Sequence, residues 1–224
     1  MNPIKHLAII MDGNGRWGIK HKKSRNLGHK EGLKTVEMVL KESIKKKIKF
    51  LTLYVFSTEN WKRPINEKKY LFKLLENYLN DKLEELDKNN IKIKIVGKKI
   101  FSKKLNNLLD HSEKKTKNNT KLQVNIALNY GSKSEIVDTF KVIKKKKLQI
   151  SENSISQNLY TSGIPDPDIL IRTGNTHRLS NFLLWQIAYS EIFFEKKLWP
   201  DFKKKDLNMI FNNFKKRKRN YGNI

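Results

Sequence analysis

The feature that most constrains this chain is the alternation of short, almost continuously apolar runs with longer stretches of helical periodicity. The first run, from His6 to Met11, has no polar residue after His6 and is typical of a central strand in a parallel sheet. Residues 31–46 then repeat apolar side chains at helical spacing, and the run "IKFLTLYVFS" at 48–57 follows as a second buried strand. These three segments predict a β-loop-α-β unit.

The same alternation continues along the chain. Further helices are predicted near 67–87, 103–117 and 134–145, and further strands at 91–97, 122–131 and 168–174, with an aromatic-rich segment and a basic helix after Pro200. The sequence therefore predicts an α/β fold with an open, mostly parallel central sheet flanked by helices on both faces. Residues 1–224 are expected to form a single domain.

Composition narrows the possible functions. Hydrophobic residues make up 38% of the 224, enough for one core, and the absence of cysteine excludes disulfides, thiolate catalysis and cysteine zinc sites. No signal peptide or membrane span is predicted, so we expect a cytoplasmic protein. The net charge of +26 favours anionic partners, although lysine runs are usually solvated. The aromatic residues lie within apolar runs, which disfavours nucleic-acid binding.

Polar residues follow the predicted strands at their carboxyl ends, where open parallel sheets bind ligands. They are Asp12, residues 57–60, residues 129–131 and residues 172–174. We therefore expect these four loops to converge on one site.

Glycines 13, 15 and 18 fit the G-x-G-x-x-G pattern of dinucleotide-binding folds. Such a loop should open directly into a helix, and an acid should close the second strand. Residues 19–32 show no helical apolar period and the second strand ends without an acid, so a nicotinamide or flavin site is disfavoured.

A glycine-rich turn can still bind phosphate oxygens through its N–H groups, with Arg16 and Arg25 supplying charge. Asp12 would be repelled by a diphosphate unless a divalent cation lay between them, which favours Mg²⁺ at this site. The alternative, that Asp12 only caps the turn after the strand, stays open at this point.

A second group is Arg172, Arg178 and Ser180, whose spacing suits another phosphate. Two phosphate sites in one crevice indicate two phosphorylated substrates. The alternative is that the arginines form ion pairs with Asp166 or Asp168.

Three further features are ambiguous on sequence alone. The segment "FSTENWKRP" places Ser57, Glu59, Asn60, Trp61 and Arg63 after a buried strand and resembles a site loop, although the tryptophan could instead cover the core edge. A lone histidine, position 29, is more often structural than catalytic. Glu191 lies inside an apolar run, which suits a residue at the edge of the core, at an oligomer interface or at a metal site.

Four motifs stand in order: "HLAIIMDGNGRW", "RNLGHKEG", "LTLYVFSTENWKRP" and "PDPDILIRTGNTHRLSNFLLWQIAYSEIFFEKKLWPDF". Together they resemble the cis-prenyltransferase family, including its bacterial undecaprenyl diphosphate synthases, over nearly the whole chain. The resemblance implies repeated condensation of isopentenyl diphosphate onto an allylic diphosphate such as farnesyl diphosphate. It also implies Mg²⁺, a homodimer, and a long-chain product, expected to be undecaprenyl diphosphate for the cell-wall lipid carrier. Loose association with the inner membrane face is a further expectation.

The resemblance also implies roles for individual residues. Asp12 would help to hold the metal, with Glu191 as a second acidic position near it, and Asn60 would take part in proton removal. Isopentenyl diphosphate would be held by Arg172, Arg178 and Ser180. The allylic diphosphate and its surroundings would involve Gly13, Asn14, Gly15, Arg16, Trp17, Arg25, His29, Ser57, Glu59, Trp61 and Arg63.

The resemblance has two local departures. Asn175 and Thr176 follow "RTG" where the family commonly has Gly-Gly-Glu, and Ser132 and Lys133 replace the last two residues of "NYGGR". Both lie beside expected site loops.

The growing chain would need an apolar tunnel, which the helices at 33–44 and 71–86 could line.

Overall fold

The computed structural model describes residues 4–217 and contains one six-stranded sheet in which every pairing is parallel. The strand order is β3-β4-β2-β1-β5-β6. The strands are β1 (His6–Ile10), β2 (Phe50–Ser57), β3 (Ile91–Val96), β4 (Leu122–Tyr130), β5 (Ile169–Arg172) and β6 (Glu191–Phe194). The expected open α/β sheet is confirmed.

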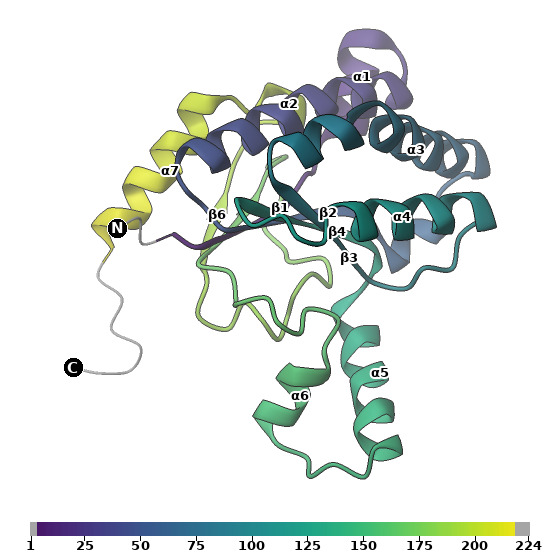
Figure 1. Cartoon of the computed structure of the whole chain (residues 1–224). Helices are drawn as coiled ribbons and strands as arrows, with labels where there is room; N and C mark the ends of the chain where they lie inside the picture. Colours follow the sequence, from purple (N-terminus) through teal and green to yellow (C-terminus); the bar gives the residue numbers. More distant parts are fainter. Residues whose placement is uncertain (1–3, 218–224) are drawn as a thin grey trace.

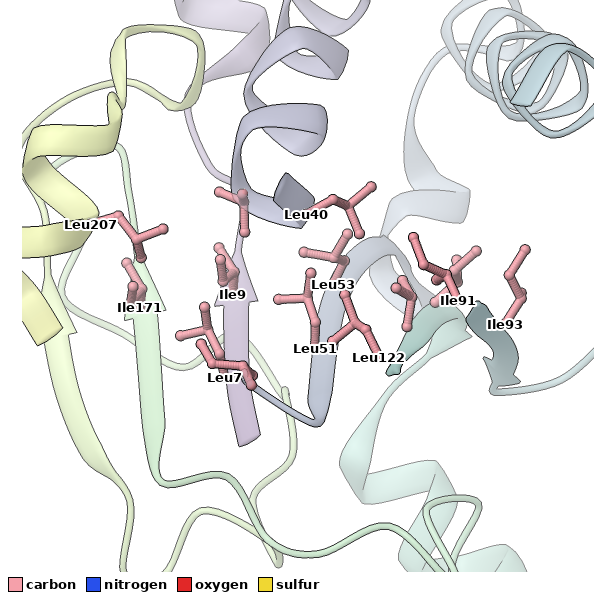
Figure 2. Packing of buried hydrophobic residues seen from close by; sticks show 14 of the residues in the cluster. Leu7, Ile9, Leu40, Leu51, Leu53, Ile91, Ile93, Leu122, Ile171 and Leu207 are labelled. Carbon is pink, nitrogen blue, oxygen red and sulfur yellow. The ribbon is translucent and has the colours of Figure 1, made fainter. Parts of the chain in front are cut away.

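Four helices cover one face of this sheet: α2, α3, α4 and α7 all lie on the same side in Figure 1. Figure 2 shows Ile9, Leu53 and Ile171 of the strands pointing to that side. They meet Leu40 of α2 and Leu207 of α7 in the main core. The helices are α1 (Asn14–Lys22), α2 (Arg25–Lys45), α3 (Ile65–Lys88), α4 (Lys103–Lys115), α5 (Ser132–Lys145), α6 (Glu152–Asn158) and α7 (Lys204–Lys216), with short 3₁₀ turns η1 (Thr58–Lys62) and η2 (Trp199–Asp201).

An irregular segment provides much of the cover on the other face. Phe182, Leu183 and Ile187 are buried there against a second cluster of strand residues. Helices α5 and α6 extend from this side (Figure 1) and pack together around a small cluster centred on Ile143 and Ile155. The irregular segment also reaches the strands' carboxyl ends, where Arg178 and Ser180 line a cavity.

The prediction that no helix follows the glycine turn was wrong, because α1 begins at Asn14, directly after Gly13. The reason is close backbone packing. A Cβ on Gly18 would lie 2.2 Å from the Ser24 carbonyl oxygen, and one on Gly28 would lie 1.9 Å from that of Asn14. The backbones of α1 and α2 therefore pack directly against each other at Gly18 and Gly28. Such a contact does not require apolar side chains at helical spacing, so the sequence pattern did not reveal the helix.

Strand β6 and the short helix α6 were also not predicted as elements. Both are short, and β6 forms as the last strand of a sheet whose other members come from distant parts of the chain. Within residues 4–217, no helix combines the length and apolar character needed to cross a bilayer.

Candidate active site

The strand ends converge on Asp12. Because Ile10 of β1 is paired with Arg172 of β5, the Arg172 guanidinium reaches the Asp12 carboxylate, with Nη2 2.8 Å from Oδ2. Nη2 of Arg16 lies 3.2 Å from the other carboxylate oxygen. Arg172 is thus ion-paired with Asp12, whereas the Asp168 carboxylate accepts the backbone N–H groups of residues 5 and 6.

Asp12 is held in its charged form. Burial alone would raise the pKa of this carboxyl, but the hydrogen bond and charge of Arg172, together with Arg16, hold its pKa below the usual range. Among the residues that line the small cavity beside the glycine turn, Asp12 is the acidic one, and it is ionised at neutral pH.

The turn itself forms a small polar cavity of about 210 Å³. Gly13 adopts φ 110°, a left-handed conformation that favours glycine, and delivers the chain into the start of α1. The first N–H groups of a helix have no carbonyl partner and form an anion site. The cavity is lined by Met11, Asp12, Gly13, Asn14, Gly15, Arg16, Arg25, His29 and Arg63.

A buried carboxylate that the sequence reasoning missed organises these cations. Glu67, at the start of α3, accepts two hydrogen bonds from Arg25 at 3.2 and 3.3 Å and one from Arg63 at 3.2 Å. Its Oε1 also lies 3.5 Å from His29 Nε2. The spacing of four residues between Arg63 and Glu67 could have predicted their ion pair from sequence. The contact with Arg25 could not be predicted, because Arg25 belongs to a different helix.

Neighbouring charges set the protonation of this group. Burial opposes ionisation of Glu67, yet the hydrogen bond and charge of Arg25, with Arg63, hold its pKa below the usual range. Burial, together with the nearby positive charge of Arg63, lowers the pKa of His29 to about 4. At neutral pH the imidazole is therefore uncharged, and the arginines carry the positive charge.

The second predicted phosphate group is also assembled. Arg172, which is almost fully buried, donates from Nη1 to Ser180 Oγ at 2.7 Å and also to the Arg178 carbonyl oxygen. The Tyr54 hydroxyl donates to the Ser180 carbonyl oxygen at 3.3 Å. One buried guanidinium thus links Asp12 to the segment that carries the other two residues.

The loop after β2 is closed by reciprocal hydrogen bonds. The Asn60 N–H donates to Ser57 Oγ at 3.2 Å, and the Ser57 N–H donates to Asn60 Oδ1 at 3.1 Å. Both residues line a larger cavity. This capping pattern fixes the Asn60 side chain at the mouth of that cavity.

The larger cavity has a volume of about 390 Å³ and joins polar and apolar regions. Its polar lining includes Asp12, His29, Arg63, Arg172, Arg178 and Ser180, and five residues are shared with the small cavity. The rest of the lining is mainly apolar and comes from α2, α3 and the strands. It includes Leu33, Val36, Leu40, Leu71, Leu74, Leu75, Tyr78, Leu79, Leu86, Ile91 and Ile93. The two predicted helices therefore line an apolar tunnel.

Three of the residues predicted to bind substrate do not line either cavity. The Trp17 indole N–H donates to Asp201 at 2.8 Å, and Glu59 is exposed. Trp61 packs with Phe56, Phe72 and Phe101, as expected for a tryptophan that covers the core edge. Their predicted substrate contacts remain predictions.

Glu191 does not share a site with Asp12 in one chain. It is the first residue of β6, paired in register with Ile169, whereas Arg172 pairs with Phe194 at the other end of the strand. Three strand residues correspond to about 10 Å. Glu191 instead accepts a hydrogen bond from Arg217. The expected two-carboxylate metal site is therefore not formed within residues 4–217 of a single chain, because the strand register separates its members.

The residues around Asp12 could hold Mg²⁺ only together with a substrate diphosphate. Among the described residues, no group of three or more acidic or histidine side chains could enclose a metal. Mg²⁺ is, however, commonly bound through one or two carboxylates plus substrate phosphates. Asp12 is ionised and faces the diphosphate-sized polar cavity, so its chemistry matches a cation that arrives with a diphosphate.

The departure at position 175 has a structural explanation. Asn175 has φ 53°, in the left-handed region that glycine prefers and asparagine tolerates best among the other residues. Thr176 donates its hydroxyl to the Gly174 carbonyl oxygen at 3.3 Å. Asparagine can therefore adopt the backbone conformation that this turn has after β5.

Comparison with known proteins agrees with this geometry. Residues 10–222 match the family model described as "Putative undecaprenyl diphosphate synthase". The chain is 46% identical to the isoprenyl transferase of Rickettsia typhi, covering 99% of both chains. It is 45% identical to that of Clostridium tetani, covering 100% of this chain and 91% of that protein.

Two solved structures share the fold over almost the full length. A probable undecaprenyl diphosphate synthase from Campylobacter jejuni is 37% identical, with a TM-score of 0.85, covering 99% of this chain and 100% of that chain. Lavandulyl diphosphate synthase from Lavandula x intermedia, solved with dimethylallyl diphosphate, is 28% identical, with a TM-score of 0.93 and 98% of both chains covered.

Proposed function

The chain belongs to the undecaprenyl diphosphate synthase family of cis-prenyltransferases, and on this premise we propose that it extends an allylic diphosphate with several isopentenyl diphosphate units. The proposed starter is farnesyl diphosphate and the proposed product is a long-chain polyprenyl diphosphate, undecaprenyl diphosphate, for the cell-wall lipid carrier.

One observation carries the proposal: the polar residues at the strand ends open into a cavity of about 390 Å³ that is mainly apolar beyond them. A substrate with a charged diphosphate head and a growing hydrocarbon tail needs both environments side by side. A transferase for two small polar substrates would not need the apolar part.

We assign the allylic diphosphate to the small cavity at the start of α1. The helix N–H groups and the guanidinium groups of Arg16, Arg25 and Arg63 supply donors and positive charge there. His29, neutral at pH 7, can hydrogen-bond to a phosphate oxygen without adding charge. The isopentenyl diphosphate is assigned to Arg172, Arg178 and Ser180, on the opposite side of Asp12.

In the proposed reaction the allylic carbon–oxygen bond breaks and diphosphate leaves. The electron pair of the isopentenyl double bond forms the new carbon–carbon bond, and loss of a proton re-forms a double bond. The cations at the small cavity stabilise the negative charge that develops on the leaving diphosphate. Asp12 would hold Mg²⁺, which neutralises further diphosphate charge when bound.

Proton loss takes place at the mouth of the apolar cavity, where Asn60 and Ser57 lie. We propose that Asn60 helps to orient the isopentenyl unit for this step. An amide is not a strong base at neutral pH, so the departing diphosphate is a suitable final proton acceptor.

The deciding experiment combines the protein with farnesyl diphosphate, labelled isopentenyl diphosphate and Mg²⁺, with an EDTA control, and sizes the products by mass spectrometry. A metal-dependent ladder of products is expected, because the cavity continues beyond the polar residues. An undecaprenyl product requires that the ladder end at about eleven isoprene units. Products of a single condensation would contradict the proposed long-chain product.

We further propose that two copies associate through α5 and the neighbouring segment. Val137 and Phe140 of α5 are 53% and 41% exposed, and Ile150 and Tyr189 are 65% and 71% exposed. Large apolar side chains left exposed in this way suit an interface. Sedimentation equilibrium of the full chain should give about twice the monomer mass, and a monomer at all concentrations would contradict the proposal.

A further inference from the structure

We propose that Asn181 is a positioning residue, which couples the segment assigned to isopentenyl diphosphate to the loop that carries Asn60. This inference rests on the proposed assignment of Arg172, Arg178 and Ser180 to that substrate. Asn181 lines neither cavity, so its effect on the reaction has to pass through its neighbours.

Three hydrogen bonds fix Asn181 between two other loops. Its side-chain Nδ2 donates to Glu59 Oε1 at 2.8 Å, within η1. Its Oδ1 accepts the Lys133 N–H at 2.8 Å, and its backbone carbonyl accepts the Ser132 N–H at 2.8 Å. Asn181 is thus bonded to the turn after β2 and to the turn after β4 at once.

The backbone around Asn181 needs such restraint. Ser180, Asn181 and Leu183 have φ values of 48°, 62° and 48°, all in the left-handed region that non-glycine residues rarely occupy. Conformations of this kind persist only where surrounding contacts impose them. Asn181 and the turn at Ser132 provide several of those contacts.

The departure at Ser132 strengthens this restraint. Ser132 Oγ accepts the Leu184 N–H at 3.0 Å, a bond that a glycine at this position could not form. Space beside it is tight, because a Cβ on Gly131 would lie 2.8 Å from Asn181 Nδ2. The turn after β4 therefore holds the segment at both Asn181 and Leu184.

Two functional neighbours depend on this arrangement. Ser180, adjacent to Asn181, accepts the 2.7 Å hydrogen bond from Arg172. Glu59, on the other side, is adjacent to Asn60. If Asn181 moves, Ser180 loses its fixed position beside Arg172, whereas the small cavity around Arg25 and Glu67 is untouched. The affinity for isopentenyl diphosphate should therefore change selectively.

The test swaps the donor and the acceptor in the hydrogen bond between Asn181 and Glu59. Asn181→Asp keeps an acceptor for the Lys133 N–H and tolerates the left-handed backbone, but it places a carboxylate against Glu59. Glu59→Gln alone keeps an acceptor for Asn181 Nδ2. In the double variant Asn181→Asp with Glu59→Gln, the glutamine amide can donate to the new carboxylate, so the bond is restored in reverse.

Steady-state elongation is measured for the wild-type chain and the three variants, varying each substrate in turn. Asn181→Asp should raise the KM for isopentenyl diphosphate about tenfold and change the KM for the allylic diphosphate by less than about twofold. The double variant should return close to the value of Glu59→Gln. Thermal unfolding of each variant checks that the fold is retained.

An equal fold-change from Asn181→Asp in both Glu59 backgrounds, or equal changes in both KM values, would overturn the positioning role while leaving the proposed function intact. A wild-type chain that does not consume isopentenyl diphosphate would contradict the proposed function, and this inference with it.

Discussion

Charged side chains at this site act through their partners rather than singly. Asp12 is ionised because Arg172 and Arg16 bind it, and Glu67 holds Arg25 and Arg63 in place around the small cavity. Such residues have two effects when removed. They change the chemistry of the site, and they leave a buried partner without its counter-charge.

Asp12→Ala should therefore lower elongation by about 100-fold or more, because the site loses the carboxylate that we propose holds Mg²⁺. It should also lower the free energy of unfolding by about 2 kcal/mol, since the buried Arg172 guanidinium loses its charge partner. Kinetics with Mg²⁺ and urea denaturation measure the two effects. Activity within a factor of about three of wild type would contradict the metal assignment.

His6 gives a pH prediction outside the site. Its ring nitrogens lie 2.6 Å from the Pro165 carbonyl oxygen and 2.7 Å from Thr52 Oγ1, and burial lowers its pKa from 6.5 to about 4. Between these values the unfolded chain binds a proton that the folded chain does not. Stability contributed by neutral His6 is therefore present above pH 6.5 and lost as the pH falls towards 4.

The matched comparison is wild type against His6→Asn in urea at two pH values. On going from about pH 7.5 to pH 5, the wild type should lose about 2 kcal/mol more unfolding free energy than the variant. His29, whose pKa is also about 4, contributes equally to both chains and cancels. Parallel pH dependences would show that His6 is not buried in its neutral form.

At the scale of elements, the site depends on how helices meet each other and the sheet. Gly18 and Gly28 bring α1 and α2 into backbone contact, which places the start of α1 beside Arg25. Helix α3 has two functions: its first turn supplies Glu67, and its apolar face lines the large cavity as far as Leu86. The same helix thus connects the polar site to the tunnel.

Leu86→Trp should shorten the product, because the larger side chain fills part of the cavity lining far along α3 from Glu67. Mass spectrometry of the polyprenyl products should show a shorter ladder at similar initial rates of condensation. Asp81→Trp is the matched control, since Asp81 is exposed on the same helix and does not line the cavity. Identical product lengths for wild type and Leu86→Trp would show that the chain does not grow along α3.

At the scale of the whole molecule, the net charge of +26 dominates long-range interactions. Most of the excess is lysine, spread over many elements, and much of it is expected to be solvated. A field of this sign still attracts anionic membrane surfaces, to which a long polyprenyl product would also partition.

We expect the full chain to float with vesicles that contain anionic lipid at low salt and to be released at about 0.5 M salt, where the screening length falls to a few ångströms. Vesicles of neutral lipid are the control, because binding to them would come from insertion of apolar side chains into the membrane and not from charge. Absence of binding to anionic vesicles at low salt would remove the proposed membrane association.

The sequence by itself determined most of the helices and strands and the chemistry at the strand ends. The apolar runs predicted five of the six strands, because buried parallel strands need near-continuous apolar residues. Since parallel strands share one carboxyl edge, it could also be predicted that the loops carrying Asp12, Asn60 and Arg172 meet around one cavity. Local patterns sufficed for all of these.

Only the tertiary structure decided which distant side chains meet. The pairing of Glu67 with Arg25 and the bond from Asn181 to Glu59 join residues far apart in sequence. The strand register also moved Glu191 away from Asp12. Periodicity describes which face of an element is buried, but not which element it meets or in which register. Those contacts are fixed only when the sheet is assembled and packed.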